Sequence, residues 1–162
     1  MFFRIKKIKG KGYAYIVENL WNRKGSRQKV KGYIGRVYRF ELKNNVGFSE
    51  YINKNIQDYI ENNSKNKVIS DLVEWELFKF GIDKNEFAVD LTNITLQKNG
   101  KNVAFLLNEG FMCSRTLKNL FEFKTEGDEE ADGYRFARCF VEAGIKVPQD
   151  VFIGLFQKLL SF

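Results

Sequence analysis

The chain of 162 residues contains no histidine and two cysteines, Cys113 and Cys139. The lack of histidine excludes imidazole zinc sites, Ser-His-Asp triads and a cysteine nucleophile activated by histidine. Two cysteines indicate reduced, partly buried thiols rather than a disulfide framework. We therefore expect no cofactor, no metal site and no enzymatic activity.

Long hydrophobic runs are also absent. No apolar stretch approaches the roughly 18 residues that a membrane-spanning helix needs, and the basic N-terminus is not followed by the apolar segment of a secretory signal. Apolar residues nevertheless make up 44% of the chain, with 16 Phe, which is enough to form a core. The composition predicts a folded cytoplasmic protein that does not span a membrane.

Acidic residues are scarce in the first 46 positions. This segment holds 13 Lys and Arg against Glu18 and Glu41, a net charge of +11, whereas the remaining 116 residues hold 14 basic and 18 acidic side chains, a net charge of −4. Such segregation is typical of a surface that binds nucleic acid or an anionic membrane. The polyanion-binding function is therefore expected in the N-terminal segment.

Alternating apolar and polar residues predict three antiparallel strands in this segment. Phe2 to Lys9 is followed by a turn, and the strands Tyr13 to Trp21 and Arg27 to Val37 flank a loop over 22–26 in which Gly25 adopts a left-handed conformation. A three-residue loop would place Trp21 opposite Arg27, Asn19 opposite Lys29, Val17 opposite Lys31 and Tyr15 opposite Tyr33, all on one face.

Cations interleaved with aromatic rings are typical of nucleic-acid surfaces, because the cations neutralise phosphates and the rings stack on bases. The predicted binding residues are Tyr13, Tyr15, Trp21, Arg23, Lys24, Arg27, Lys29, Lys31 and Tyr33. The alternative is that these aromatic side chains are packed beneath the rest of the protein while the lysines are merely solvated.

The remaining chain predicts an α+β protein in which the three-stranded basic sheet and its helix precede a mostly helical part with one β-hairpin. Helices are expected over 49–62, 70–80, 114–121, 129–143 and 148–160, and Asn99-Gly100 predicts a hairpin joining 89–97 to 102–107. A polar linker over 62–67 would separate a basic module, 1–62, from an acidic α+β domain, 68–162, although the two could pack as one unit.

The segment from Gly12 to Arg36 resembles the N-terminal hairpin of a group of DDE insertion-sequence transposases. The resemblance rests on Tyr13, Tyr15, Val17, Glu18, Gly25, Arg27, Gln28, Tyr33 and Gly35. In that family the hairpin precedes the catalytic domain and is expected to hold DNA, so the resemblance favours DNA over RNA. It covers about 25 residues, and the chain has no room for the catalytic core after residue 46.

Two other function classes compete with nucleic-acid binding. The first is a protein-interaction or scaffold module whose acidic helical part docks a partner, the basic sheet being incidental. The apolar stripe of the C-terminal helix is typical of a core but would also suit a partner subunit or a homo-oligomer; it consists of Val151, Phe152, Leu155, Phe156 and Leu159. A remote alternative is a metal-dependent nuclease, because Asp90 with Glu122 and Lys124 imitates an Asp and Glu-x-Lys pattern.

Overall fold

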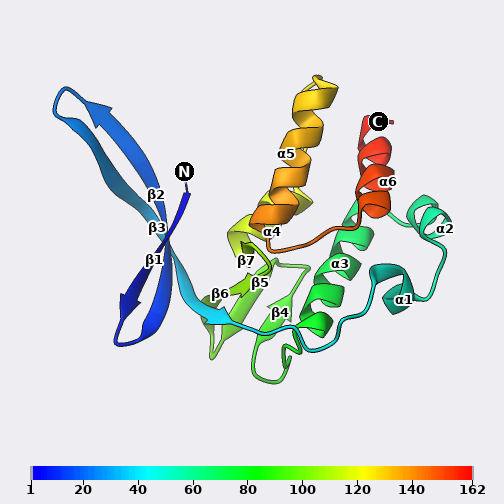
Figure 1. The fold of residues 1–162 in the computed structure, drawn as a ribbon, viewed down its shortest axis with the longest axis horizontal. Helices are drawn as coiled ribbons and strands as arrows, with labels where there is room; N and C mark the ends of the chain where they lie inside the picture. Colours follow the sequence, from blue (N-terminus) through cyan, green and yellow to red (C-terminus); the bar gives the residue numbers. More distant parts are fainter. Residues whose placement is uncertain (1, 162) are drawn as a thin grey trace.

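The computed structural model describes residues 2–161 and has the expected α+β architecture (Figure 1). Three strands open the chain, β1 (Phe2–Ile8), β2 (Lys11–Asn22) and β3 (Gly25–Arg39). Three helices follow, α1 (Phe48–Ile52), α2 (Ile56–Glu61) and α3 (Lys65–Lys79). Four short strands come next, β4 (Ala88–Asp90), β5 (Thr95–Lys98), β6 (Lys101–Leu107) and β7 (Gly110–Met112). The described chain ends with α4 (Ser114–Phe121), α5 (Glu129–Glu142) and α6 (Gln149–Leu160).

One sheet joins the N-terminal strands to the rest of the protein. Its order is β1-β2-β3-β6-β5-β4, and β7 pairs with β6. The junction is parallel and places Arg36 beside Val103 and Arg39 beside Leu106. This pairing was not predicted, and it carries the sheet across the expected boundary at 62–67.

The sheet curls strongly at its N-terminal end. The rings of Phe3 in β1 and Phe111 in β7 lie 5.5 Å apart, although β2, β3 and β6 separate these strands. A flat sheet would hold them roughly 19 Å apart, at about 4.8 Å per strand. The concave side encloses a small cluster in which Ala14, Ala104 and Cys113 are fully buried.

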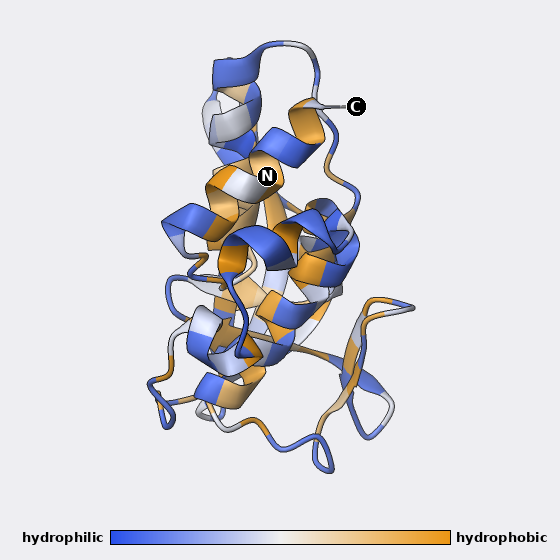
Figure 2. Cartoon of the chain, turned by 90° about the vertical axis from the view of Figure 1, so that its right-hand side faces the viewer, coloured by the Kyte–Doolittle hydropathy of each residue, from blue (hydrophilic) through white to orange (hydrophobic). Residues whose placement is uncertain are grey.

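The main core lies on the other side of the β6 region, beneath the helices. Five of the most buried side chains of this core come from helix α3: Val68, Ile69, Leu72, Val73 and Leu77. Hydrophobic and hydrophilic residues mix along each helix in Figure 2, as expected for helices with one buried side. The apolar stripe predicted on the last helix packs here, with Val151 and Leu155 fully buried.

Several predicted element boundaries were wrong. The helix expected over 49–62 is split into α1 and α2 at Asn53, whose φ of 53° is left-handed, and it begins at Phe48 after the N-cap Gly47. The expected linker contains Ser64, whose hydroxyl accepts a hydrogen bond from the Lys67 amide and starts α3. Helix α3 therefore begins five residues earlier than predicted.

The second hairpin also differs from its prediction. Asn99 and Gly100 form the expected turn, with φ values of 53° and 75°, and Gln97 pairs with Asn102. The strand expected over 89–97 is interrupted between β4 and β5, because Asp90 accepts hydrogen bonds from the amides of Thr92 and Asn93 and forms a turn. With β7 added, this part has four strands rather than two.

None of the helices between residues 2 and 161 combines the length and apolar character required to cross a membrane.

Candidate nucleic-acid interface

The β2–β3 hairpin projects away from the helices as a free arm (Figure 1). Strand β1 pairs with β2 as far as Val17, and β6 pairs with β3 only from Arg36 onward. Between these limits the hairpin is a ribbon of two strands, here called the distal ribbon, Glu18–Asn22 with Gly25–Lys31. All residues from 21 to 31 are exposed.

The register of the distal ribbon differs by one residue from the prediction. Asn22 pairs with Gly25, so the turn contains two residues, Arg23 and Lys24, rather than three. The Asn22 side chain accepts a hydrogen bond from the Lys24 amide at 2.8 Å and tightens this turn. Gly25 does have the expected positive φ, at 113°.

A bulge restores the predicted register nearer the base of the hairpin. Ile16 pairs with Gly32 while Val17 pairs with Val30, so Lys31 is the extra residue. Tyr15 therefore lies opposite Tyr33, as predicted. Because the register changes at Lys31, the predicted residues do not share one face; they divide between two.

One face carries the tyrosines. We call it the tyrosine face and define it by Arg4 and Lys6 of β1, Tyr13 and Tyr15 of β2, and Tyr33 and Arg36 of β3, which cross-strand pairing places on the same side. The rings of Tyr15 and Tyr33 lie 5.0 Å apart, and the Lys6 Nζ atom lies 4.9 Å from the Tyr15 ring centroid.

The tyrosine face continues onto the root of the sheet. The Arg36 guanidinium lies 4.7 Å from the ring centroid of Tyr38, and the Lys98 ammonium lies 5.2 Å from the same ring. Lys98 is already paired with Glu86 at 2.8 Å. The Arg36 Nε atom, by contrast, is buried with no hydrogen-bond partner among the described residues, so this guanidinium retains donor capacity.

Tyr33 keeps its proton on this face. Partial burial, and then the proximity of Tyr15, Tyr13 and Tyr38, raise the pKa of the Tyr33 phenol above its usual value. A phenol that stays neutral adds no negative charge near a phosphate and donates a hydrogen bond. The chemistry of the face is therefore cationic and hydrogen-bond donating.

The opposite face carries the remaining cations. Leu20 lies opposite Arg27, and Glu18 lies opposite Lys29. The Lys31 Nζ atom is 3.0 Å from a carboxylate oxygen of Glu18, and both side chains are more than one third exposed. We call this the Glu18 face. It is also cationic, but it contains a carboxylate that the tyrosine face lacks.

The predicted aromatic residues differ in exposure. Trp21, near the tip, is 78% exposed and Tyr33 is 55% exposed, so neither is packed beneath the rest of the protein. Tyr13 and Tyr15 are half-buried. The predicted cations Arg23, Lys24, Arg27, Lys29 and Lys31 are all exposed.

Sequence reasoning missed Arg4, Lys6 and Arg36. The sequence did contain the information needed to place Arg4. Lys9 and Gly10, with φ values of 52° and 78°, form a two-residue hairpin turn, and this turn sets Arg4 opposite Tyr15. Arg36 lies opposite Tyr13 by the same pairing logic.

The base of the hairpin faces α4 and α5 across a cavity of about 220 Å³. Phe2, Phe3 and Ile16 line the strand side, and Arg115, Asn119 and Arg138 lie on the helix side. The Arg138 side chain is paired with Glu142 at 2.8 Å and remains largely exposed. Basic side chains thus extend from the arm to the adjoining helices.

The residues of the nuclease alternative occupy separate elements. Glu122 and Lys124 are exposed at and just after the end of α4, whereas Asp90 ends β4. The Asp90 side chain is engaged with Asn93, whose side-chain and backbone hydrogen bonds lower the pKa of the carboxyl. Residues 2–161 contain no group of three or more acidic or cysteine side chains arranged to hold a metal ion.

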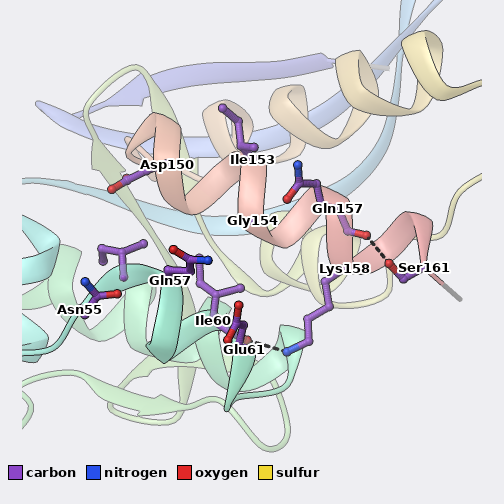
Figure 3. A pocket seen from close by; sticks show the side chains of 11 residues that line it. Asn55, Gln57, Ile60, Glu61, Asp150, Ile153, Gly154, Gln157, Lys158 and Ser161 are labelled. Carbon is purple, nitrogen blue, oxygen red and sulfur yellow. Dashed lines mark hydrogen bonds between the residues drawn. The ribbon is translucent and has the colours of Figure 1, made fainter.

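A hollow of about 770 Å³ lies between α2 and α6 (Figure 3). These two helices lie at the end of the molecule away from the hairpin (Figure 1). Lys158 reaches across from α6 and donates hydrogen bonds to the carbonyls of Ile60, at 2.6 Å, and Asn63. On α6, Ile153 and Leu160 are 45% and 40% exposed. This is the surface relevant to the predicted protein partner.

Comparisons with protein-family models, with curated proteins and with solved structures found no match to this chain.

Proposed function

We propose that this protein binds nucleic acid through the projecting hairpin and has no catalytic role in doing so. The observation that carries the proposal is the tyrosine face, where Arg4, Lys6 and Arg36 surround a group of tyrosines and no carboxylate of the hairpin lies among them. Cations of this density attract phosphates, and exposed rings stack on bases or sugars.

The contacts within the face support this proposal. Lys6 and Arg36 lie against tyrosine rings rather than against acids, so their charges are not neutralised within the protein. Arg4 donates to the neutral amide of Gln28 at 2.9 Å. A polyanion would therefore meet cations that are held in place yet still uncompensated.

The test is a salt titration of binding to fluorescein-labelled duplex DNA, single-stranded DNA and structured RNA. Lys6→Glu combined with Lys29→Glu changes one cation on each face and should weaken binding about tenfold or more, with a shallower dependence of log K on log salt. The matched control is Lys54→Glu with Lys124→Glu, which makes the same charge change at exposed positions outside the hairpin and outside its continuation at Lys98. Equal weak binding by all three proteins would refute the proposal.

A second candidate function, docking of a protein partner, is favoured by the hollow between α2 and α6 and the exposed Ile153 and Leu160 beside it. It predicts an oligomer or a co-purifying protein that persists at high salt, where nucleic-acid contacts are lost. Size-exclusion chromatography with light scattering in 1 M salt distinguishes the two candidates.

A further inference from the structure

The distal ribbon has the dimensions of a groove-binding element. Its two strands lie about 4.8 Å apart, and the five residues from Glu18 to Asn22 span about 17 Å. A two-stranded ribbon fits the major groove of B-form DNA, which is about 12 Å wide, but not the minor groove, which is about 6 Å wide. Both outer edges of the ribbon lack a neighbouring strand among the described residues.

The centre of the ribbon presents two amide side chains. Asn19 and Gln28 are directly opposite each other on the side of the tyrosine face, and both are exposed. Arg4 donates to the Gln28 Oε1 atom, which orients that amide and leaves its NH₂ group free, while the Asn19 side chain has no hydrogen-bond partner among the described residues. Asparagine and glutamine amides match the N6 and N7 positions of adenine in the major groove.

Cations lie at the tip of the ribbon and on its opposite face. Arg23 and Lys24 form the tip, and Arg27, Lys29 and Lys31 project from the opposite face. Their long side chains suit the phosphates that border a groove, because phosphate contacts fix the position of a protein on a duplex while base contacts give specificity.

On these grounds we propose that the distal ribbon enters the major groove of duplex DNA, with Asn19 and Gln28 against the base edges and the cations of the ribbon against the phosphates. The inference rests on the proposed nucleic-acid binding and narrows it to one target. A-form RNA has a deep, narrow major groove that side chains cannot enter, so duplex RNA is a poor fit.

The experiment compares three duplexes of about 20 base pairs and equal sequence by fluorescence anisotropy at fixed salt. These are unmodified DNA, DNA whose cytosines carry glucosylated hydroxymethyl groups that fill the major groove, and RNA. The unmodified duplex should bind about tenfold more tightly than the other two, because the number of phosphates is equal in all three and the major groove is open to a ribbon only in the unmodified DNA.

A double variant tests the amide pair. Asn19→Ala with Gln28→Ala should weaken binding to unmodified DNA about fivefold or more without changing the salt dependence, because the amides carry no charge. Gln97→Ala with Asn102→Ala is the matched control, since these residues form a similar cross-strand amide pair, 3.2 Å apart, in the β5–β6 hairpin. The control should bind as the wild type does.

The outcomes separate this inference from the function on which it rests. Equal affinity for all three duplexes, or wild-type binding by the Asn19 and Gln28 variant, overturns binding in the major groove but leaves nucleic-acid binding intact. Absence of salt-dependent binding to any duplex or single strand overturns both.

Discussion

The ammonium of Lys31 lies 3.0 Å from the carboxylate of Glu18, across the two strands of the projecting hairpin. Glu18 is the sole acidic residue in the first 40 positions of the sequence, and it also lies opposite Lys29. It therefore offsets positive charge on the Glu18 face, beside the amide pair of Asn19 and Gln28 on the opposite side of the ribbon. An exposed pair of this kind adds about 0–1 kcal/mol to stability, so its larger effect is on the local potential.

Removing this carboxylate should tighten nucleic-acid binding. Glu18→Gln frees Lys31 and removes a repulsive charge beside the phosphates, and we expect the dissociation constant to fall about two- to fivefold at low salt. The melting temperature should stay nearly unchanged. Glu50→Gln, an exposed acid on α1, makes the same charge change outside the hairpin and should leave binding unaltered. An equal gain in both variants would show that only net charge matters.

A buried ion pair in the body of the protein gives a second prediction. Glu76 is fully buried and pairs with Lys79 at 3.1 Å, while also accepting hydrogen bonds from the Asn108 side chain and the Lys146 amide. Lys79→Met leaves this carboxylate without a countercharge and should cost about 3–5 kcal/mol in urea unfolding. Combining it with Glu76→Gln should recover part of that loss, and a loss below about 1 kcal/mol in the single variant would contradict this account.

The features predicted correctly from the sequence are those fixed by neighbouring residues. The dipeptide Asn99-Gly100 was predicted to form a hairpin turn, and it does. Both ends of helix α4, Ser114 and Phe121, were also predicted correctly. The parallel pairing of β3 with β6 depends on segments more than 60 residues apart, and no local periodicity encodes it. For this reason the sheet was predicted as two pieces.

The candidate site shows the same division between local and distant information. Composition identified the basic arm, and Tyr15 was correctly placed opposite Tyr33. The two-residue turn at Arg23-Lys24 and the bulge at Lys31 each shift the pairing register by one residue. A shift of one residue places a side chain on the other face of the sheet. Arg27 and Lys29 were therefore assigned to the face of the tyrosines and lie on the other.

The junction between the arm and the body depends on Gly35. Its φ is 151°, and a Cβ atom there would lie 2.3 Å from the Asn102 carbonyl oxygen, a backbone atom that cannot move aside cheaply. Gly35→Ala should therefore lower stability by about 1–3 kcal/mol in thermal or urea unfolding. Gly32→Ala is the control, because a Cβ atom at Gly32 meets nothing within 4 Å. Equal stability of the two variants would argue against a tight β3–β6 contact.

The phenol of Tyr59 makes stability depend on alkaline pH. Tyr59 is 4% exposed and donates a hydrogen bond to Asp71; burial first, and then this bond and the Asp71 charge, raise the pKa of the phenol far above its usual value. The folded state thus keeps a proton that the unfolded chain releases near pH 10, about the ordinary value for tyrosine. This contribution is complete below that pH and is lost as the pH rises further.

Urea unfolding at several pH values from 8 to 11 measures this contribution. Tyr59→Phe should lose about 0.5–1.5 kcal/mol at pH 8 through the missing hydrogen bond, while its stability should decline less steeply above pH 10 than that of the wild type. Lysine deprotonation affects both proteins alike, so the difference between the two slopes isolates Tyr59. Tyr134→Phe, which removes a phenol that is 78% exposed, should follow the wild-type slope. If Tyr59→Phe and the wild type decline in parallel, the Tyr59 phenol does not hold its proton in the folded state.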